Sequence, residues 1–101
     1  MVIYQIKYRF LGTVDTNKIG TYISYLEGIG FHAREPYAKH LVDEIWELRP
    51  LNHRILYAPW DDKSFILLHH FIKKTRKTPQ REIDQAKRNL ADFRERSNEN
   101  E

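Results

Sequence analysis

The sequence predicts a single α+β domain in which helices pack against a small and mainly antiparallel β-sheet. Three observations predict it: an alternating N-terminal segment, three strand-like segments joined by hairpin-length connections, and an amphipathic stripe near the C-terminus. The chain has 101 residues, about the size of one domain. We therefore expect one domain over residues 1–96 and a frayed tail over residues 97–101.

The first elements are a strand and a helix. Residues 2–10 alternate and are rich in β-branched and aromatic side chains, which predicts a strand that breaks at Gly12. Asp15 or Thr16 can cap a helix that runs to about Gly28. Its apolar residues recur on one face: Ile19, Tyr22, Ile23 and Leu26. Glycines then end the helix, and residues 31–40 are expected to form an irregular link.

The middle of the chain predicts three strands, over residues 45–49, 54–58 and 65–73. Pro50 and Asn52 separate the first two, and Pro59 with Asp61 and Asp62 separates the last two. Connections this short join antiparallel neighbours, so the expected element order is β-α-β-β-β-α.

The last helix carries the clearest signal. Thr78 is a suitable N-cap, and Pro79 suits the first helical position, where a missing N–H costs nothing. One apolar stripe follows at helical spacing: Ile83, Ala86, Leu90 and Phe93. We expect this stripe to pack on the sheet.

Composition limits the environment and the chemistry. The chain has no cysteine, which excludes disulfides and thiolate zinc sites and favours a reducing cytoplasm. No apolar run exceeds the four residues 65–68, and no secretory signal is visible, so we expect no membrane association. Phosphate-loop, dinucleotide-binding and serine-nucleophile motifs are absent from the sequence, so no cofactor is expected.

The histidines do not predict a metal site. His69 and His70 are adjacent on a predicted strand, so their side chains leave opposite faces of the sheet. No His-x-x-x-His pair occurs in the sequence. We therefore expect no bound metal.

The distribution of charge is uneven. Residues 1–72 carry eight basic and eight acidic side chains, whereas residues 73–96 carry nine basic and four acidic ones. A basic block on a balanced domain attracts polyanions. The alternative is a solvated helix face without a ligand.

Cations from several strand ends can converge at one edge of the predicted meander: Arg49, Arg54, Lys73, Lys74 and Arg76, with His69 and His70 nearby. Convergent Arg and Lys suit a phosphodiester and the negative charge that develops on it during cleavage. A ribonuclease needs little more, because RNA supplies its own 2′-hydroxyl nucleophile. The alternative is that Arg49 and Arg54 only pair at the surface with Asp43, Glu44 or Glu47.

Several aromatic residues have a simpler interpretation. Trp46 and Phe71 are expected in the core, together with Leu48, Leu56 and Leu67. Tyr57 could stack on a base but is expected to pack against a helix instead. Trp60 is expected at a turn, as a possible exposed contact for a partner.

Three segments resemble a known toxin superfamily: Ile45-Trp46-Glu47-Leu48-Arg49, Arg54-Ile55-Leu56-Tyr57, and Phe71-Ile72-Lys73-Lys74-Thr75-Arg76-Lys77-Thr78-Pro79. They are similar to the HigB-like branch of the RelE/ParE superfamily, and the resemblance covers about residues 22–93. It implies the toxin of a type II toxin–antitoxin pair, which cuts mRNA on the ribosome. It also implies a helix-turn-helix (HigA-like) antitoxin as the protein partner.

The resemblance also implies roles for individual residues. Arg54, Lys73 and Lys74 would be catalytic, through charge stabilisation and proton transfer. The residues that would bind RNA are Arg49, Arg76, Lys77 and His69. Two alternatives stay open: a non-catalytic or attenuated basic binding module of the same fold, and a ParE-like gyrase poison.

Overall fold

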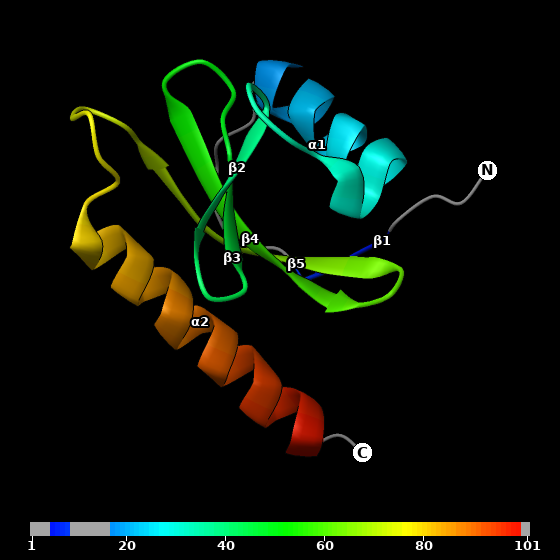
Figure 1. Ribbon diagram of the computed structural model, residues 1–101. Coiled ribbons are helices and arrows are strands. Elements are labelled where there is room, and N and C mark those ends of the chain that lie inside the picture. Colours follow the sequence, from blue (N-terminus) through cyan, green and yellow to red (C-terminus); the bar gives the residue numbers. More distant parts are fainter. Residues whose placement is uncertain (1–4, 9–16, 100–101) are drawn as a thin grey trace.

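The computed structural model describes residues 5–8 and 17–99, which form a five-stranded sheet with one helix on each face (Figure 1). The elements in chain order are β1 (Gln5–Tyr8), α1 (Asn17–Ile29), a 3₁₀ turn η1 (Gly30–His32), β2 (Ala38–Val42), β3 (Ile45–Leu48), β4 (His53–Asp61), β5 (Ser64–Ile72) and α2 (Gln80–Glu99). The strand order is β1-β5-β4-β3-β2. Strand β1 is parallel to β5, and the other neighbours are antiparallel, which confirms the predicted α+β class.

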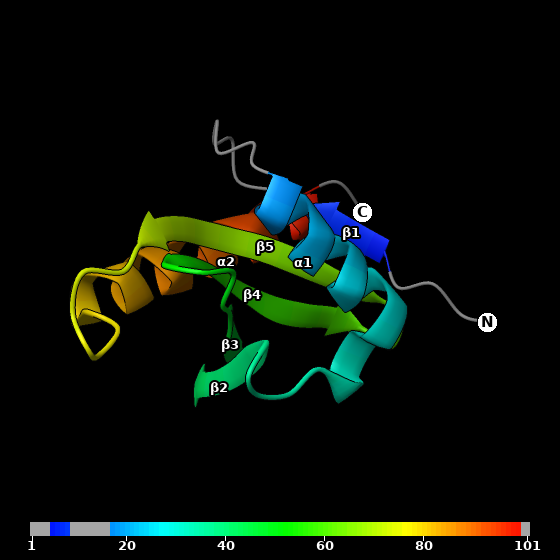
Figure 2. The same cartoon turned by 90° about the horizontal axis from the view of Figure 1, so that it is seen from above.

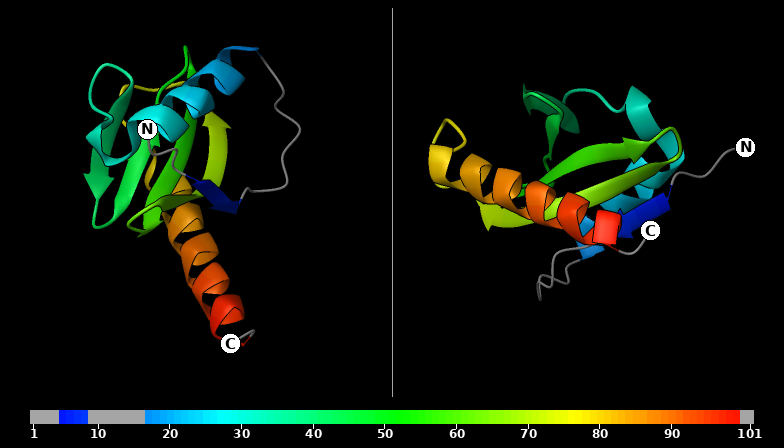
Figure 3. Two further views of the ribbon diagram at one scale, coloured as in Figure 1. Left: turned by 90° about the vertical axis from the view of Figure 1, so that its right-hand side faces the viewer. Right: turned by 90° about the horizontal axis from the view of Figure 1, so that it is seen from below.

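The sheet separates two apolar clusters. In Figure 2, α1 lies in front of the sheet and α2 behind it, and the view from below in Figure 3 shows the reverse. Because side chains alternate along a strand, neighbouring residues of β4 join different clusters. Ile55 and Tyr57 pack on the α1 side, whereas Leu56 and Ala58 pack on the α2 side.

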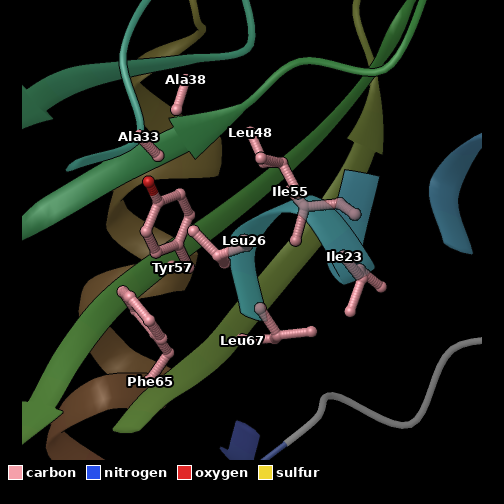
Figure 4. Packing of buried hydrophobic residues seen from close by; sticks show 9 residues of the cluster. All are labelled: Ile23, Leu26, Ala33, Ala38, Leu48, Ile55, Tyr57, Phe65 and Leu67. Atoms are coloured by element: carbon pink, nitrogen blue, oxygen red, sulfur yellow. The ribbon is translucent and has the colours of Figure 1, made fainter. Parts of the chain in front are cut away.

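The core on the α1 side is shown in Figure 4, where Leu26 points from α1 toward the sheet. It consists of Ile23, Leu26, Ala33, Ala38, Leu48, Ile55, Tyr57, Phe65 and Leu67. Burial raises the pKa of Tyr57, in keeping with a packing role rather than an exposed stacking role.

The core on the α2 side contains the predicted stripe of the last helix. Ala86 and Leu90 are buried there, and Phe93 packs against the same cluster. Trp46, Leu48, Leu56, Leu67 and Phe71 also pack in one of the two clusters, as predicted.

The link predicted for residues 31–40 contains the start of a strand. Strand β2 begins at Ala38 and pairs with β3 through a tight turn. Asp43 occupies this turn with φ 50°, a left-handed conformation that Asp tolerates better than most residues. The sequence signal was weak because the turn contains no glycine or proline, the residues that usually mark a hairpin.

The second predicted hairpin connection was placed too early. Strand β4 continues through Pro59 to Asp61, and Pro59 pairs with Phe65 of β5. Trp60 is therefore a strand residue, half-buried against Phe93 of α2 with 4.8 Å between ring centroids. The prediction of an exposed turn residue was wrong, because the apolar surface of α2 covers this position.

The structure describes where α1 ends, but not the residues that were predicted to cap its start. Helix α1 ends at Ile29, close to the predicted end, and is followed by Gly30 with φ 61°. The predicted caps, Asp15 and Thr16, lie outside the described residues. Helix α2 runs to Glu99, and residues 100–101 of the expected tail lie outside the described residues. Among the described residues, no helix is long and apolar enough to cross a membrane.

Candidate anion-binding cavity

A cavity of about 360 Å³ opens on the α2 side, near the loop that joins β5 to α2 (yellow in Figure 1). Its cations come from β2, from the residue after β3 and from this loop, and the wall is completed by the start of α2. The lining residues are Lys39, His40, Leu41, Glu47, Arg49, Lys73, Arg76, Lys77, Thr78 and Ile83. Five of these side chains are lysine or arginine, and one is a carboxylate. We call this hollow the basic cavity.

Sheet register explains why these residues meet. Lys39 of β2 pairs directly with Glu47 of β3, and directly opposed residues share a face. Glu47 pairs with Leu56 of β4, whose side chain lies in the cluster against α2. Arg54, two residues before Leu56, therefore also lies on this face.

Glu47 forms the floor of the basic cavity. Its side chain is almost completely buried, with 1% of its surface exposed. Oε1 lies 3.6 Å from Nε of Arg49 and 3.7 Å from Nε of Arg54, while Oε2 accepts a 2.5 Å hydrogen bond from the hydroxyl of Thr78. A buried carboxylate is stable only with such partners, so Glu47 fixes the positions of two arginines and of the loop before α2.

Thr78 has a different role from the predicted N-cap. Its hydroxyl donates to Glu47, and the first helical N–H groups, from Glu82 and Ile83, donate to the carbonyl of Pro79. Pro79 thus occupies the cap position, one residue later than predicted. Among the described residues, no helical N–H donates to the side-chain oxygen of Thr78, and the proton of its hydroxyl is directed across the fold to the Glu47 carboxylate.

Arg54 lies behind the wall of the cavity rather than in its lining. Only 8% of its surface is exposed, and Nη1 donates to the carbonyls of Leu51 at 2.8 Å and His53 at 2.7 Å. Among the described residues, its Nε has no hydrogen-bond partner and is close only to Glu47. Burial lowers the pKa of Arg54, and the Coulombic attraction of Glu47 opposes this shift.

Lys73 is the cation of the cavity with a shifted pKa. Its backbone N–H donates to the carbonyl of Asn52 at 2.7 Å, which fixes the end of β5 against the start of β4. Burial lowers the pKa of Lys73; Glu47 raises it, and the cations of Arg54, Arg49 and Lys39 lower it further. Lys73 therefore releases its proton more readily than a lysine in water.

The structure brings together only part of the predicted site. Four of the predicted residues, Arg49, Lys73, Arg76 and Lys77, line the basic cavity, and Arg54 lies against its floor. Lys74 instead lines a neighbouring hollow with His70, Ile72 and Arg81.

His69 also lies outside the lining of the basic cavity. It faces α2, where its Nε2 lies 2.8 Å from a carboxylate oxygen of Glu82. His70 lies on the other face, where its Nε2 is 3.0 Å from Nδ1 of His53, so the prediction of opposite faces is confirmed. In the described part of the chain, no group of three or more His, Cys, Asp or Glu could hold a metal.

Four of the five basic residues of α2, Arg81, Lys87, Arg94 and Arg96, form ion pairs instead. Lys87 lies 3.6 Å from Asp43, and Arg94 lies 2.9 Å from Glu44. These two acids therefore pair with α2, not with Arg49 and Arg54 as the surface alternative suggested. Of the three acids considered, only Glu47 contacts those arginines, and it does so in the interior.

Sequence reasoning missed six of the ten lining residues as site residues: Lys39, His40, Leu41, Glu47, Thr78 and Ile83. One signal was present. Glu47 follows Ile45 by two positions on a predicted strand, which places a carboxylate on the apolar face, where an unpaired charge is costly. Lys39 could not be placed because β2 was not predicted.

The fold and the cation-lined cavity define a small α+β domain of the RelE-like type. The family described as "Phage derived protein Gp49-like (DUF891)" matches residues 11–91, and the chain belongs to this family. It is a family of RelE/HigB-like toxins, so the predicted superfamily resemblance is confirmed at that level. No curated protein matches the chain significantly.

Proposed function

We propose that this protein is the toxin of a type II toxin–antitoxin system and that it cuts mRNA on the ribosome. The observation that carries the proposal is the basic cavity, where cations from three separate segments surround one buried carboxylate. Phosphodiesters are bound by convergent Arg and Lys, and a half-buried site strengthens that attraction. Membership of a RelE/HigB-like toxin family supports the same function.

The proposed reaction needs no nucleophile from the protein. The 2′-hydroxyl oxygen of RNA attacks the adjacent phosphorus, the bond to the 5′-oxygen breaks, and a 2′,3′-cyclic phosphate forms. Negative charge grows on the phosphoryl oxygens, where Arg49, Arg76 and Lys77 would offset it. The leaving 5′-oxygen takes a proton, which we assign to Lys73 because its pKa is lowered. The proton of the attacking 2′-hydroxyl passes to solvent water, and Lys73 then regains a proton from water.

Arg54 receives a supporting role in this proposal. Its guanidinium bonds two backbone carbonyls and faces Glu47, so it holds the floor of the cavity rather than the substrate. Lys74 and His69 receive no role in the reaction, because each lies outside the lining of the cavity.

The proposed partner is a helix-turn-helix antitoxin. An excess of cations in one concavity attracts an acidic segment as well as RNA, so an antitoxin can inhibit by covering the same cavity. A small helix-turn-helix protein encoded beside this chain, and co-purifying with it, would support the pairing.

The proposal is tested by expressing Lys73→Ala and wild type in bacterial cells. Wild type should arrest growth and shorten messages only while ribosomes translate them. Lys73→Ala should relieve the arrest, with cleavage slower by about 10²–10⁴-fold, the usual effect of losing a general acid. The matched control is Lys63→Ala, which removes the same charge from the exposed β4–β5 turn at the far end of the hairpin.

Three results would contradict the proposal. Arrest with intact messages and broken chromosomes would indicate a gyrase poison. No arrest by the wild type would indicate a non-catalytic binding module. Equal loss of activity in the Lys73 and Lys63 variants would indicate a general charge effect rather than a site.

A further inference from the structure

We propose that a second cavity, on the α1 side of the sheet, binds a small neutral aromatic molecule that carries one hydrogen-bonding group. The cavity has a volume of about 250 Å³, and we call it the aromatic cavity. Its lining residues are Gly30, Phe31, Ala33, Trp46, Tyr57, Pro59 and Phe65. Tyr57 and Phe65 belong to the cluster under α1, so the aromatic cavity and the basic cavity lie on opposite faces of the sheet. The inference is therefore independent of the proposed function.

The lining of the aromatic cavity favours a flat ring without charge. Four of the seven lining residues are aromatic, and none of the seven is charged. A charged ligand would lose its hydration there without an opposite charge in the lining to replace it. The rings already pack on one another, since Phe65 lies 5.0 Å from Phe31 and 5.6 Å from Tyr57 between centroids. The walls are therefore preformed, as in most sites for small molecules.

The hydroxyl of Tyr57 supplies the polar contact. Tyr57 has only 2% of its surface exposed, and in Figure 4 its hydroxyl oxygen points away from Phe65 and toward Ala33. This hydroxyl has no hydrogen-bond partner among the described residues. It is not sealed from solvent either, because in the described part of the chain Nε of Arg54 is the one sealed side-chain atom without a partner. A buried hydroxyl that opens onto a cavity and has no partner there can bind one polar group of a ligand.

The volume of the aromatic cavity suits one ring or two fused rings. An apolar cavity of about 150 Å³ in another protein stays dry and binds benzene. The aromatic cavity is larger, so it has room for a bicyclic molecule. Because apolar walls are poorly hydrated, a ligand that enters displaces little well-bound water.

The surroundings favour a free small molecule over a side chain of a protein partner. A stable protein interface buries about 800 Å² on each partner, much of it around a central apolar patch. Among the described residues, the large exposed apolar side chains are Ile29, Tyr37, Leu51 and Ile72, and none of these four lines the aromatic cavity. The cavity is therefore a separate hollow rather than the centre of a broad apolar surface.

The test is an NMR titration of the whole isotope-labelled chain with two probes, indole and indene. The two molecules have nearly the same shape, but only indole has an N–H that can donate to the Tyr57 hydroxyl. Both probes should shift the backbone amide signals of Gly30 and Ala33 to saturation, with a Kd of about 1 mM or lower. Tyr57→Phe should weaken indole binding by about three- to tenfold, the effect of losing one hydrogen bond, and should leave indene binding unchanged.

Two further variants serve as controls. Tyr22→Phe removes the same hydroxyl group from a ring that packs on Tyr37 and does not line the aromatic cavity, so it should bind both probes like wild type. Ala33→Leu adds volume to a buried residue of the lining and should abolish binding of both probes. The spectrum of the free variant shows whether it folds. If Ala33→Leu does not fold, the comparison of indole with indene in Tyr57→Phe decides by itself.

Each of the following results would overturn the proposed site. Absence of a saturable shift with both probes would show that the cavity does not take up an aromatic molecule, and loss of a co-purifying protein from Ala33→Leu in that case would assign it to a partner's side chain. The same effect of Tyr57→Phe on indole and indene would exclude the hydroxyl from the contact. Binding that persists in folded Ala33→Leu would place the probes elsewhere. None of these results bears on the basic cavity, because it lies on the other face of the sheet.

Discussion

Glu47 links the stability of the fold to the geometry of the cavity. Its carboxylate is buried and lies between Arg49 and Arg54, so the three side chains cannot be arranged independently. Removing one partner of a buried charge cluster leaves the other charges without compensation. The surface ion pairs on α2 lack this property, because water solvates their charges.

We predict that Glu47→Ala lowers the free energy of unfolding by about 3 kcal/mol, because Arg54 stays buried without its carboxylate. Glu47→Gln should lose less, since its amide oxygen can still accept the hydrogen bond from Thr78. Urea denaturation measures both values. Glu95→Ala, an exposed carboxylate on α2, should change stability by less than about 0.5 kcal/mol. A Glu47→Ala variant as stable as this control would contradict the role of Glu47.

His70 makes stability depend on pH. Burial lowers the pKa of His70 from its ordinary value of 6.5, and the nearby His53 and His69 lower it further. Above pH 6.5 both the folded and the unfolded chain hold this imidazole neutral, so its contribution to stability is complete. As the pH falls below that value, the unfolded chain binds a proton that the folded chain resists, and stability declines until the lowered pKa is reached.

We predict that His70→Gln removes part of this decline between about pH 7.5 and pH 5. Glutamine keeps a group that can hydrogen-bond His53, so loss of the contact itself is limited. The measurement is the free energy of unfolding across that pH range. The same slope in wild type and His70→Gln would contradict the assignment.

At the scale of elements, a β-bulge in β5 is hydrogen-bonded to helix α2. The register with β4 steps from Leu67 to His69, so Leu68 is the extra residue. The carbonyl of Leu68 accepts a 2.7 Å hydrogen bond from the side-chain amide of Asn89. A bulge shifts the alternation of side chains by one position, which turns both Leu68 and Phe71 toward the α2 side.

We predict that Asn89→Leu lowers the free energy of unfolding by about 1–3 kcal/mol, because the Leu68 carbonyl loses the donor that satisfies it. Arg88→Ala, at an exposed position of the same helix, should have an effect within about 0.5 kcal/mol. Hydrogen exchange should also show faster opening around the bulge in Asn89→Leu. Equal stability of the two variants would show that the bulge does not depend on α2.

At the scale of the whole molecule, the basic block divides into two parts with different roles. Three cations of the loop before α2, Lys73, Arg76 and Lys77, line the cavity, whereas Lys87, Arg94 and Arg96 of the helix pair with acids. The basic block is therefore divided between a cation-lined hollow and a helix face whose cations are paired with acids. Net charge alone could not separate them, because it does not record which cations already have partners.

We predict a limited salt dependence for RNA binding. Each phosphate neutralised on a single strand contributes a slope of about −0.7 in a plot of log K against log salt concentration, so five lining cations allow a slope of at most about −3.5. Lys77→Ala should reduce its magnitude by about 0.7, and Arg96→Ala should not change it. A steeper wild-type slope would show that cations beyond the cavity take part.

The sequence by itself determined the α+β class, the position of both helices, the core stripe of α2 and most of the cations at the strand ends. These features depend on local periodicity and on short connections, which a single chain displays directly. Only the tertiary structure decided that Lys74 and His69 lie outside the cavity and that β2 supplies Lys39. It also decided that the Thr78 hydroxyl donates its hydrogen bond to Glu47. The physical reason is that each of these outcomes depends on a contact between segments that are far apart in the sequence. The spacing of residues along a strand determines on which face a side chain lies, but it does not determine which group of another segment that side chain contacts.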